Sequence, residues 1–118
     1  MPYAMPSPEM LACLKDCGEC ASMCARCAHH CLHMGKEHAA AEHQGIMRDC
    51  TSICELAACF LSRASPHAAH LCDECVEICN ECAESCDSIA HGDAMMKQCA
   101  TICRKCAQAC TKMATADV

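Results

Sequence analysis

The chain has 118 residues, a formal net charge of −6, one Tyr, one Phe and no Trp, and 18 of its residues are cysteine. This length suits a single domain, here residues 1–118, and an acidic chain with so few aromatic rings lacks the basic, base-stacking surface of a nucleic-acid-binding protein. No stretch of about 18 apolar residues occurs, so we expect no membrane-spanning helix and no membrane partner.

The first predicted helix runs from about Pro8 to Met34. Ser7 is a good N-cap, Pro8 fits the first helical position, and Glu9 places a carboxylate in the first turn. The cysteines of this segment recur in alternating steps of four and three, which keeps them on one face of a helix. They are Cys13, Cys17, Cys20, Cys24, Cys27 and Cys31.

The second predicted helix, about Ala41 to Ala64, follows a link rich in His and Ala. Its stripe contains Cys50 and Cys54 and continues to Leu61. Cys59 is five residues beyond Cys54, or about 140° around a helix, so it points off the stripe. We treat Cys59 as a weaker metal ligand, at a protomer interface or a peripheral site.

The third and fourth predicted helices cover about 66–90 and 94–114. Ser65 and Pro66 repeat the start signal of the first helix, and Asp93 is a good cap after the His-Gly turn. Both helices again have cysteines at helical spacing: Cys72, Cys75, Cys79, Cys82 and Cys86 in the third, and Cys99, Cys103, Cys106 and Cys110 in the fourth.

The links are short, so consecutive helices should be antiparallel. We therefore predict an all-α fold, an up-down-up-down antiparallel four-helix bundle with a cysteine-lined core. Leu, Ile, Val and Phe together number only 14, against 21 Ala, so cysteine must fill much of the interior. Cysteine is small and readily buried, which allows such a core to fold before metal binds.

Residues with neutral metal-binding side chains extend the stripes at one end of the predicted bundle. Thioether and imidazole bind soft metal without the charge of a thiolate, so this end is a candidate mouth through which metal enters. The alternative is that Met fills gaps and His is solvated. The mouth residues are Met34, His38, His43, Met47, His91 and Met96, whereas the opposite end has Met10, Leu61, Ala68 and Met113. The remaining histidines, His29, His30, His33, His67 and His70, are expected at the surface.

Cu(I) fits this pattern best among the metals that cysteine binds. Zinc sites and Fe–S clusters usually take four ligands each, which would divide the thiols into separate sites and leaves an unbroken stripe unexplained. Cu(I) is soft and prefers thiolate. If each ion takes two sulfurs and each sulfur bridges two ions, the protein binds many ions, about one per cysteine.

The CxxxCxxCxxxCxxCxxxC run of the first helix and the matching stripes of the third and fourth resemble the cysteine-rich four-helix-bundle copper storage proteins. The resemblance covers about residues 7–113. It implies a lumen that holds many Cu(I) ions, a homotetramer, and one end with His and Met that admits the metal. Residues 1–8 lack a basic or apolar leader, which is similar to the cytosolic branch of this family, so we expect a cytoplasmic protein.

A second apolar stripe on the second helix, Ile53, Leu56 and Phe60, indicates a contact with another protomer or with the N-terminal segment around Tyr3. Copper storage, for copper homeostasis, is the favoured function, and a copper chaperone or chelator is a possible delivery partner. The alternatives are a zinc or mixed-metal buffer, a thiol oxidoreductase and a purely structural helical protein. The oxidoreductase needs a CxxC at a helix N-terminus beside strands, which this chain lacks, so we expect no enzyme.

Overall fold

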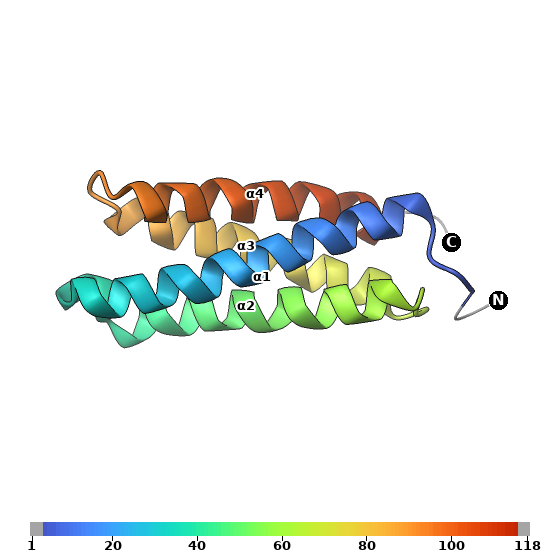
Figure 1. Cartoon of the computed structure of the whole chain (residues 1–118), viewed down its shortest axis with the longest axis horizontal. Helices are drawn as coiled ribbons and strands as arrows, with labels where there is room; N and C mark the ends of the chain where they lie inside the picture. The colour runs from blue at the N-terminus through green and yellow to red at the C-terminus, as the bar shows by residue number, and fades with distance from the viewer. Residues whose placement is uncertain (1–3, 116–118) are drawn as a thin grey trace.

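The computed structural model describes residues 4–115, and within that range it contains helices and no strand. Four long helices follow one another along the chain (Figure 1). They are α1 (Pro8–Met34), α2 (Ala41–Ser62), α3 (Ala68–Ile89) and α4 (Ala94–Ala114), with a short 3₁₀ helix η1 (Lys36–Ala39) between α1 and α2. The bundle is long and narrow, with principal extents of 50 × 18 × 17 Å.

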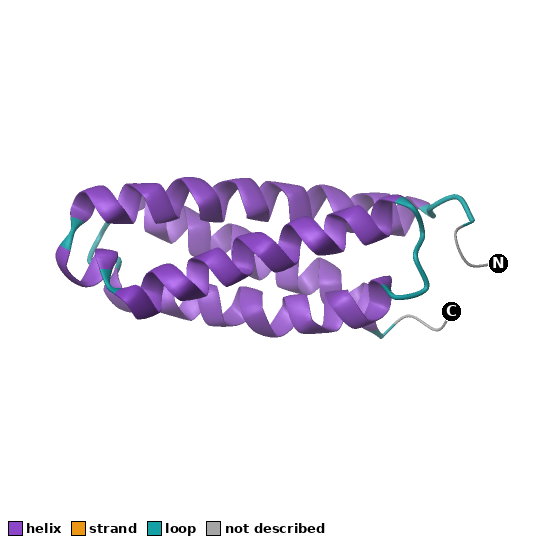
Figure 2. Cartoon of the chain, turned by 90° about the horizontal axis from the view of Figure 1, so that it is seen from below, coloured by secondary structure: helices purple, strands orange, loops and turns teal. Residues whose placement is uncertain are grey.

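Each helix runs antiparallel to the next and packs against two neighbours: α1 and α3 each contact both α2 and α4. The α1–α2 link and the α3–α4 turn lie at one end, and the α2–α3 connection lies at the other, beside the start of α1 and the end of α4 (Figure 2). The predicted all-α, up-down-up-down bundle is therefore confirmed, and the two loops that bear the mouth residues do share one end.

Two of the predicted helix starts are built as the sequence indicates. Ser7 Oγ accepts a hydrogen bond of 3.1 Å from the backbone N–H of Met10, and Asp93 Oδ1 accepts one of 2.9 Å from that of Met96. Each bond satisfies a backbone donor that has no partner within the first turn. Gly35 ends α1 with a φ of 74°, a left-handed conformation that glycine adopts without steric cost.

The α2–α3 connection is longer than predicted. Helix α2 ends at Ser62 and α3 begins at Ala68, two residues before and two residues after the expected bounds. Ala64 has a φ of 50°, which stops the helix, and the Ser65 N–H then bonds the carbonyl of Phe60 at 3.0 Å. Ser65 Oγ accepts from the N–H of His67 at 3.1 Å, so this serine caps a turn, and the helix starts beyond it.

The core consists mainly of sulfur and methyl groups. Seventeen of the eighteen cysteines are buried, and the largest fully buried side chains are Met23, Met47, Leu61 and Met96. Buried alanines such as Ala57 and Ala83 fill the space beside them. Within residues 4–115, no helix combines the length and the apolar character that crossing a bilayer requires.

Candidate metal centre

The buried cysteines form a continuous set of sulfur atoms along the axis of the bundle, here called the cysteine column. All four helices contribute, because steps of three and four residues keep each set on the inward face. Every member is at most 2% exposed. The column consists of Cys13, Cys17, Cys20, Cys24, Cys27, Cys31, Cys50, Cys54, Cys72, Cys75, Cys79, Cys82, Cys86, Cys99, Cys103, Cys106 and Cys110.

The sulfur atoms of the column are spaced for bridging by metal ions. Neighbouring Sγ atoms lie 3.5 Å apart for Cys24 and Cys103, 3.6 Å for Cys54 and Cys79, and 3.9 Å for Cys20 and Cys50. A disulfide needs about 2.05 Å, and all eighteen cysteines are free thiols. At a metal–sulfur distance of about 2.3 Å, known for zinc thiolates, such pairs subtend roughly 100–116°, so one ion fits between two sulfurs.

Groups of four sulfurs that could hold one ion overlap along the column. Within each group, all ligand atoms lie within 4.8 Å of one another. Cys20, Cys24, Cys50 and Cys103 form one group, while Cys24 and Cys103 belong also to the next group, with Cys82 and Cys99. Because neighbouring groups share sulfurs, separate four-ligand zinc sites cannot fill them all at once. The overlap favours ions that share bridging thiolates.

Burial and contacts between sulfur atoms raise the pKa of several of the thiols, which are therefore protonated near neutral pH. Loss of hydration raises the pKa of Cys31 from 9.0 to about 11. Sulfur contacts, first with Cys106, raise the pKa of Cys54, and contacts with Cys86 and Cys99 raise that of Cys27. A metal ion that binds these thiolates must displace their protons, so uptake releases protons.

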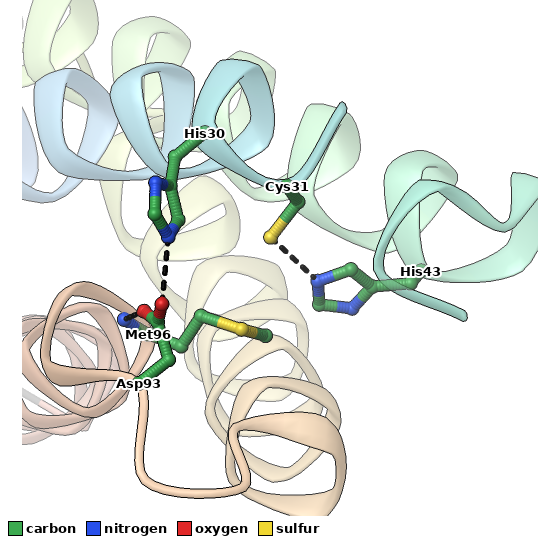
Figure 3. Close-up of polar contacts among 5 residues, drawn as sticks. All are labelled: His30, Cys31, His43, Asp93 and Met96. Atoms are coloured by element: carbon green, nitrogen blue, oxygen red, sulfur yellow. Dashed lines mark hydrogen bonds and ion pairs between the residues drawn. The ribbon is translucent and has the colours of Figure 1, made fainter. Parts of the chain in front are cut away.

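At the mouth end, an imidazole touches the last sulfur of α1. His43 Nε2 lies 3.5 Å from Cys31 Sγ (Figure 3). The other ring nitrogen, His43 Nδ1, lies 2.7 Å from Ser85 Oγ. Burial, followed by the nearby His38, lowers the pKa of His43, so its ring is neutral and has a lone pair for a metal. One layer away, Cys86 Sγ lies 4.0 Å from Met47 Sδ.

His38 is a second buried imidazole at this end. The predicted first helix stops at Met34, and the 3₁₀ helix η1 then places His38 in the interior, with 9% of its surface exposed. Its Nε2 atom is buried and has no hydrogen-bond partner within residues 4–115. A buried nitrogen without a partner is energetically costly, and a metal ion would satisfy it.

The other predicted mouth residues lie at the same end but differ in exposure. Met96 is fully buried, whereas Met34 is 46% exposed. His91 is also exposed, and its Nε2 atom lies 2.7 Å from Glu37 Oε1, so this hydrogen bond joins the two loops at the surface. The structure therefore brings four of the six residues into the interior (His38, His43, Met47 and Met96) and leaves Met34 and His91 outside.

The cysteine and the histidines that were expected off the stripe all lie outside the column, and all of them except His30 are exposed. Cys59, His29, His33, His67 and His70 are exposed. His30 is only partly exposed, and its Nε2 lies 2.8 Å from Asp93 Oδ2, which connects α1 to the start of α4 (Figure 3). The N–H of Met96 and then His30 lower the pKa of Asp93.

The opposite end of the column is closed by apolar side chains, as predicted. Leu61 and Ala68 are buried, and Met10 and Met113 pack against the core. On the second apolar stripe of α2, Ile53 and Phe60 are partly buried against the core and Leu56 is 44% exposed. Tyr3, the alternative cover for that stripe, lies outside the described residues.

Two residues of the site were missed by sequence reasoning. Met23 is 1% exposed although it is not on the cysteine stripe, and a wider apolar face on α1 was the signal available for it. Ser85, which holds His43, has no sequence signal, because the contact joins residues 42 positions apart.

Comparison with known proteins identifies the family. The model of the copper storage protein family matches residues 7–115. The chain therefore belongs to the copper storage protein family. A search of curated proteins finds no match.

Solved structures with the same architecture include proteins that hold copper. The chain is 30% identical to the Cu(I)-bound copper storage protein BsCsp3 of Bacillus subtilis, with a TM-score of 0.83, covering 91% of this chain and 99% of the other. It is 27% identical to a cytosolic copper storage protein from Streptomyces lividans solved with five coppers, with a TM-score of 0.83 and coverage of 93% and 95%. A protein from Nitrosospira multiformis is 37% identical, with a TM-score of 0.84 and coverage of 90% and 94%.

Proposed function

We propose that this protein stores Cu(I) in its cysteine column, as its membership of the copper storage family implies. The overlap of the four-sulfur groups is the observation that carries this proposal, because it suits a soft ion that accepts bridging thiolates. When ions and sulfurs are equal in number and each thiolate bridges two ions, each Cu(I) displaces one proton, so the interior stays electrically neutral. A filled column therefore avoids most of the cost of burying charge.

The proposed ligands are the seventeen cysteines of the column. Cys59 is exposed and on another face, so a copper bound there would be a peripheral one. The expected capacity is then many ions per protomer, close to the number of column cysteines. We expect the protein to act as a store and not as an enzyme, because the family whose model it matches is one of copper storage proteins.

We propose that copper enters at the mouth. Met34 and His91 are the outermost donors, and His38, His43, Met47 and Met96 are the inner ones. His43 is placed to pass an ion inward, because its Nε2 atom is 3.5 Å from the first thiol of the column, Cys31. Neutral donors suit this step, since they bind Cu(I) less tightly than the thiolates beyond them.

The decisive experiment is an anaerobic titration of the reduced, metal-free protein with Cu(I) in competition with a chromogenic Cu(I) chelator. We expect saturation near the number of column cysteines, with the helices already formed before metal is added. Saturation at a few equivalents, together with tighter binding of zinc, would support discrete zinc sites and overturn the proposal.

We further propose a cytoplasmic homotetramer that receives copper from a chaperone or a small chelator. Similarity to the cytosolic Streptomyces lividans protein supports the location. The partly exposed face of α2 around Leu56 supports a contact between copies, because burying it removes apolar surface from water. Light scattering coupled to size exclusion tests the assembly: a mass near four times 12.6 kDa is expected, and a monomer would contradict it.

A further inference from the structure

His29 and His33 form a pair on the outer surface of α1, outside the cysteine column. Both side chains are exposed, and residues four apart lie one turn from each other on the same helix face. Their Nε2 atoms are 3.3 Å apart, whereas their ring centroids are 4.8 Å apart. The two rings therefore turn these nitrogens toward each other.

We propose that His29 and His33 bind one divalent transition-metal ion, with Cu²⁺ preferred, at a surface site separate from the column. At a metal–nitrogen distance of about 2.0–2.1 Å, two nitrogens 3.3 Å apart subtend roughly 107°. A small rotation of either exposed ring brings this angle to the value of about 90° between adjacent ligands of a tetragonal Cu²⁺ ion. A hydrogen bond between neutral rings is the competing explanation. However, 3.3 Å is longer than the usual range of about 2.7–3.2 Å for bonds to a nitrogen donor.

The charge distribution around the pair also favours a cation. The pair lies in the last two turns of α1, which ends at Met34, and a helix C-terminus bears a partial negative charge. Arg26 lies one turn before His29, but its guanidinium is directed away from the pair, 3.5 Å from Met23 Sδ. Water completes the coordination, because both rings are open to solvent.

The surface pair and the column differ in their donor atoms, and they therefore prefer different oxidation states of copper. Cu(I) prefers the sulfur ligands of the column to a site that has two neutral imidazoles and no thiolate. Imidazole does suit Cu²⁺, Ni²⁺ and Zn²⁺, and among these Cu²⁺ binds most tightly at a given nitrogen site. The surface pair therefore takes the oxidised ion, and the interior takes the reduced one.

Electron paramagnetic resonance tests the site directly, since Cu(I) gives no signal and Cu²⁺ does. The column is first saturated with Cu(I) under nitrogen, and one equivalent of Cu²⁺ per protomer is then added. We expect an axial Cu²⁺ spectrum with splitting from two nitrogens. The double variant H29A/H33A should lose this spectrum, and H67A/H70A, which removes two other exposed histidines, should keep it.

A spectrum of hydrated Cu²⁺ alone in the unchanged protein, or an unchanged spectrum in H29A/H33A, would overturn the proposal. Circular dichroism checks the fold of the variants, in which alanine retains high helix propensity. A second measurement does not depend on a filled column: Ni²⁺ added to the reduced protein should broaden the ring proton signals of His33, and H29A should abolish that effect. Failure of the proposed storage function would appear separately, in the Cu(I) titration.

Discussion

A buried cysteine is both a small apolar side chain and an ionisable metal ligand. In most bundles, Leu and Ile interlock at the inward positions, whereas here thiols hold nearly all of them. Leu61 is the one large aliphatic side chain among those most fully buried in the described part of the chain, residues 4–115. Each inward cysteine therefore packs the core of the empty protein and, under the proposed function, binds copper in the loaded one.

Substituting one column cysteine should reduce capacity by a small step and preserve the fold. Cys103 Sγ lies 3.8 Å from Cys20 Sγ and 3.5 Å from Cys24 Sγ, so C103A removes a shared ligand. Loss of one buried sulfur should cost about 1 kcal/mol of stability. Cu(I) titration should show about one or two fewer ions, and C59A should match the unchanged protein. Complete loss of binding in C103A would contradict a distributed store.

Substitutions at the mouth should change the rate of loading and not the capacity. The variant H43A removes the imidazole beside Cys31, and M47L and M96L replace buried thioethers with a side chain of similar volume. Stopped-flow mixing with a Cu(I)–chelator complex should show loading slowed several-fold. M113L, at the closed end, is the matched control. Equal rates in H43A and M113L would exclude the proposed route.

At the scale of the helices, the starts of α1 and α4 are set by local chemistry, whereas the end of α2 and the start of α3 are not. Ser7 and Asp93 cap helices where the sequence predicts it, because an N-cap depends on neighbours within three residues. Ser65 and Pro66 have the same local signal. There, the left-handed Ala64 and the bond from Ser65 to Phe60 favour a turn instead. Chain reversal between packed helices overrides the local preference at this point.

In the candidate site, too, helical spacing predicts some features, whereas others depend on contacts between distant parts of the chain. The inward cysteines follow from helical spacing alone, and so does the exposure of Cys59. The burial of His38 depends on the 3₁₀ turn after Met34, and the hydrogen bond from His43 to Ser85 depends on how α2 meets α3. Contacts of this kind need the tertiary arrangement, which spacing along one helix does not contain.

Removing the cap of α4 should destabilise the mouth end. Asp93 accepts from the N–H of Met96 and also pairs with His30 on α1, so D93A leaves a backbone donor and a partly buried imidazole without their partner. We expect a loss of about 1–2 kcal/mol in the free energy of unfolding, measured by urea denaturation of the reduced apoprotein. D93N, which can still cap, should lose less. Equal stabilities for D93A and the unchanged protein would refute this role.

For the whole molecule, the stability of the empty bundle should fall in alkaline solution. The pKa of Cys31 is raised from 9.0 to about 11, so above pH 9 the unfolded chain loses this proton more readily than the folded one. The contribution of this protonated thiol to the free energy of unfolding is therefore complete below about pH 9 and is lost as pH rises through about 11. Urea midpoints of the reduced apoprotein should decrease between these values. The midpoint of C31A should decrease less steeply than that of the unchanged protein, and the midpoint of C59A should decrease as steeply.

If copper enters only at the proposed mouth, the apolar end around Leu61 and Ala68 would impose an order on the stored ions. In a narrow column with a single opening, the ion that enters last would lie nearest to that opening. Copper that settled early, beside Cys13 and Cys110, would leave only after its successors or by exchanging places with them. The position of an ion along the bundle axis would then reflect when it was bound. The ions near His43 would be released first, and those at the far end would be released last.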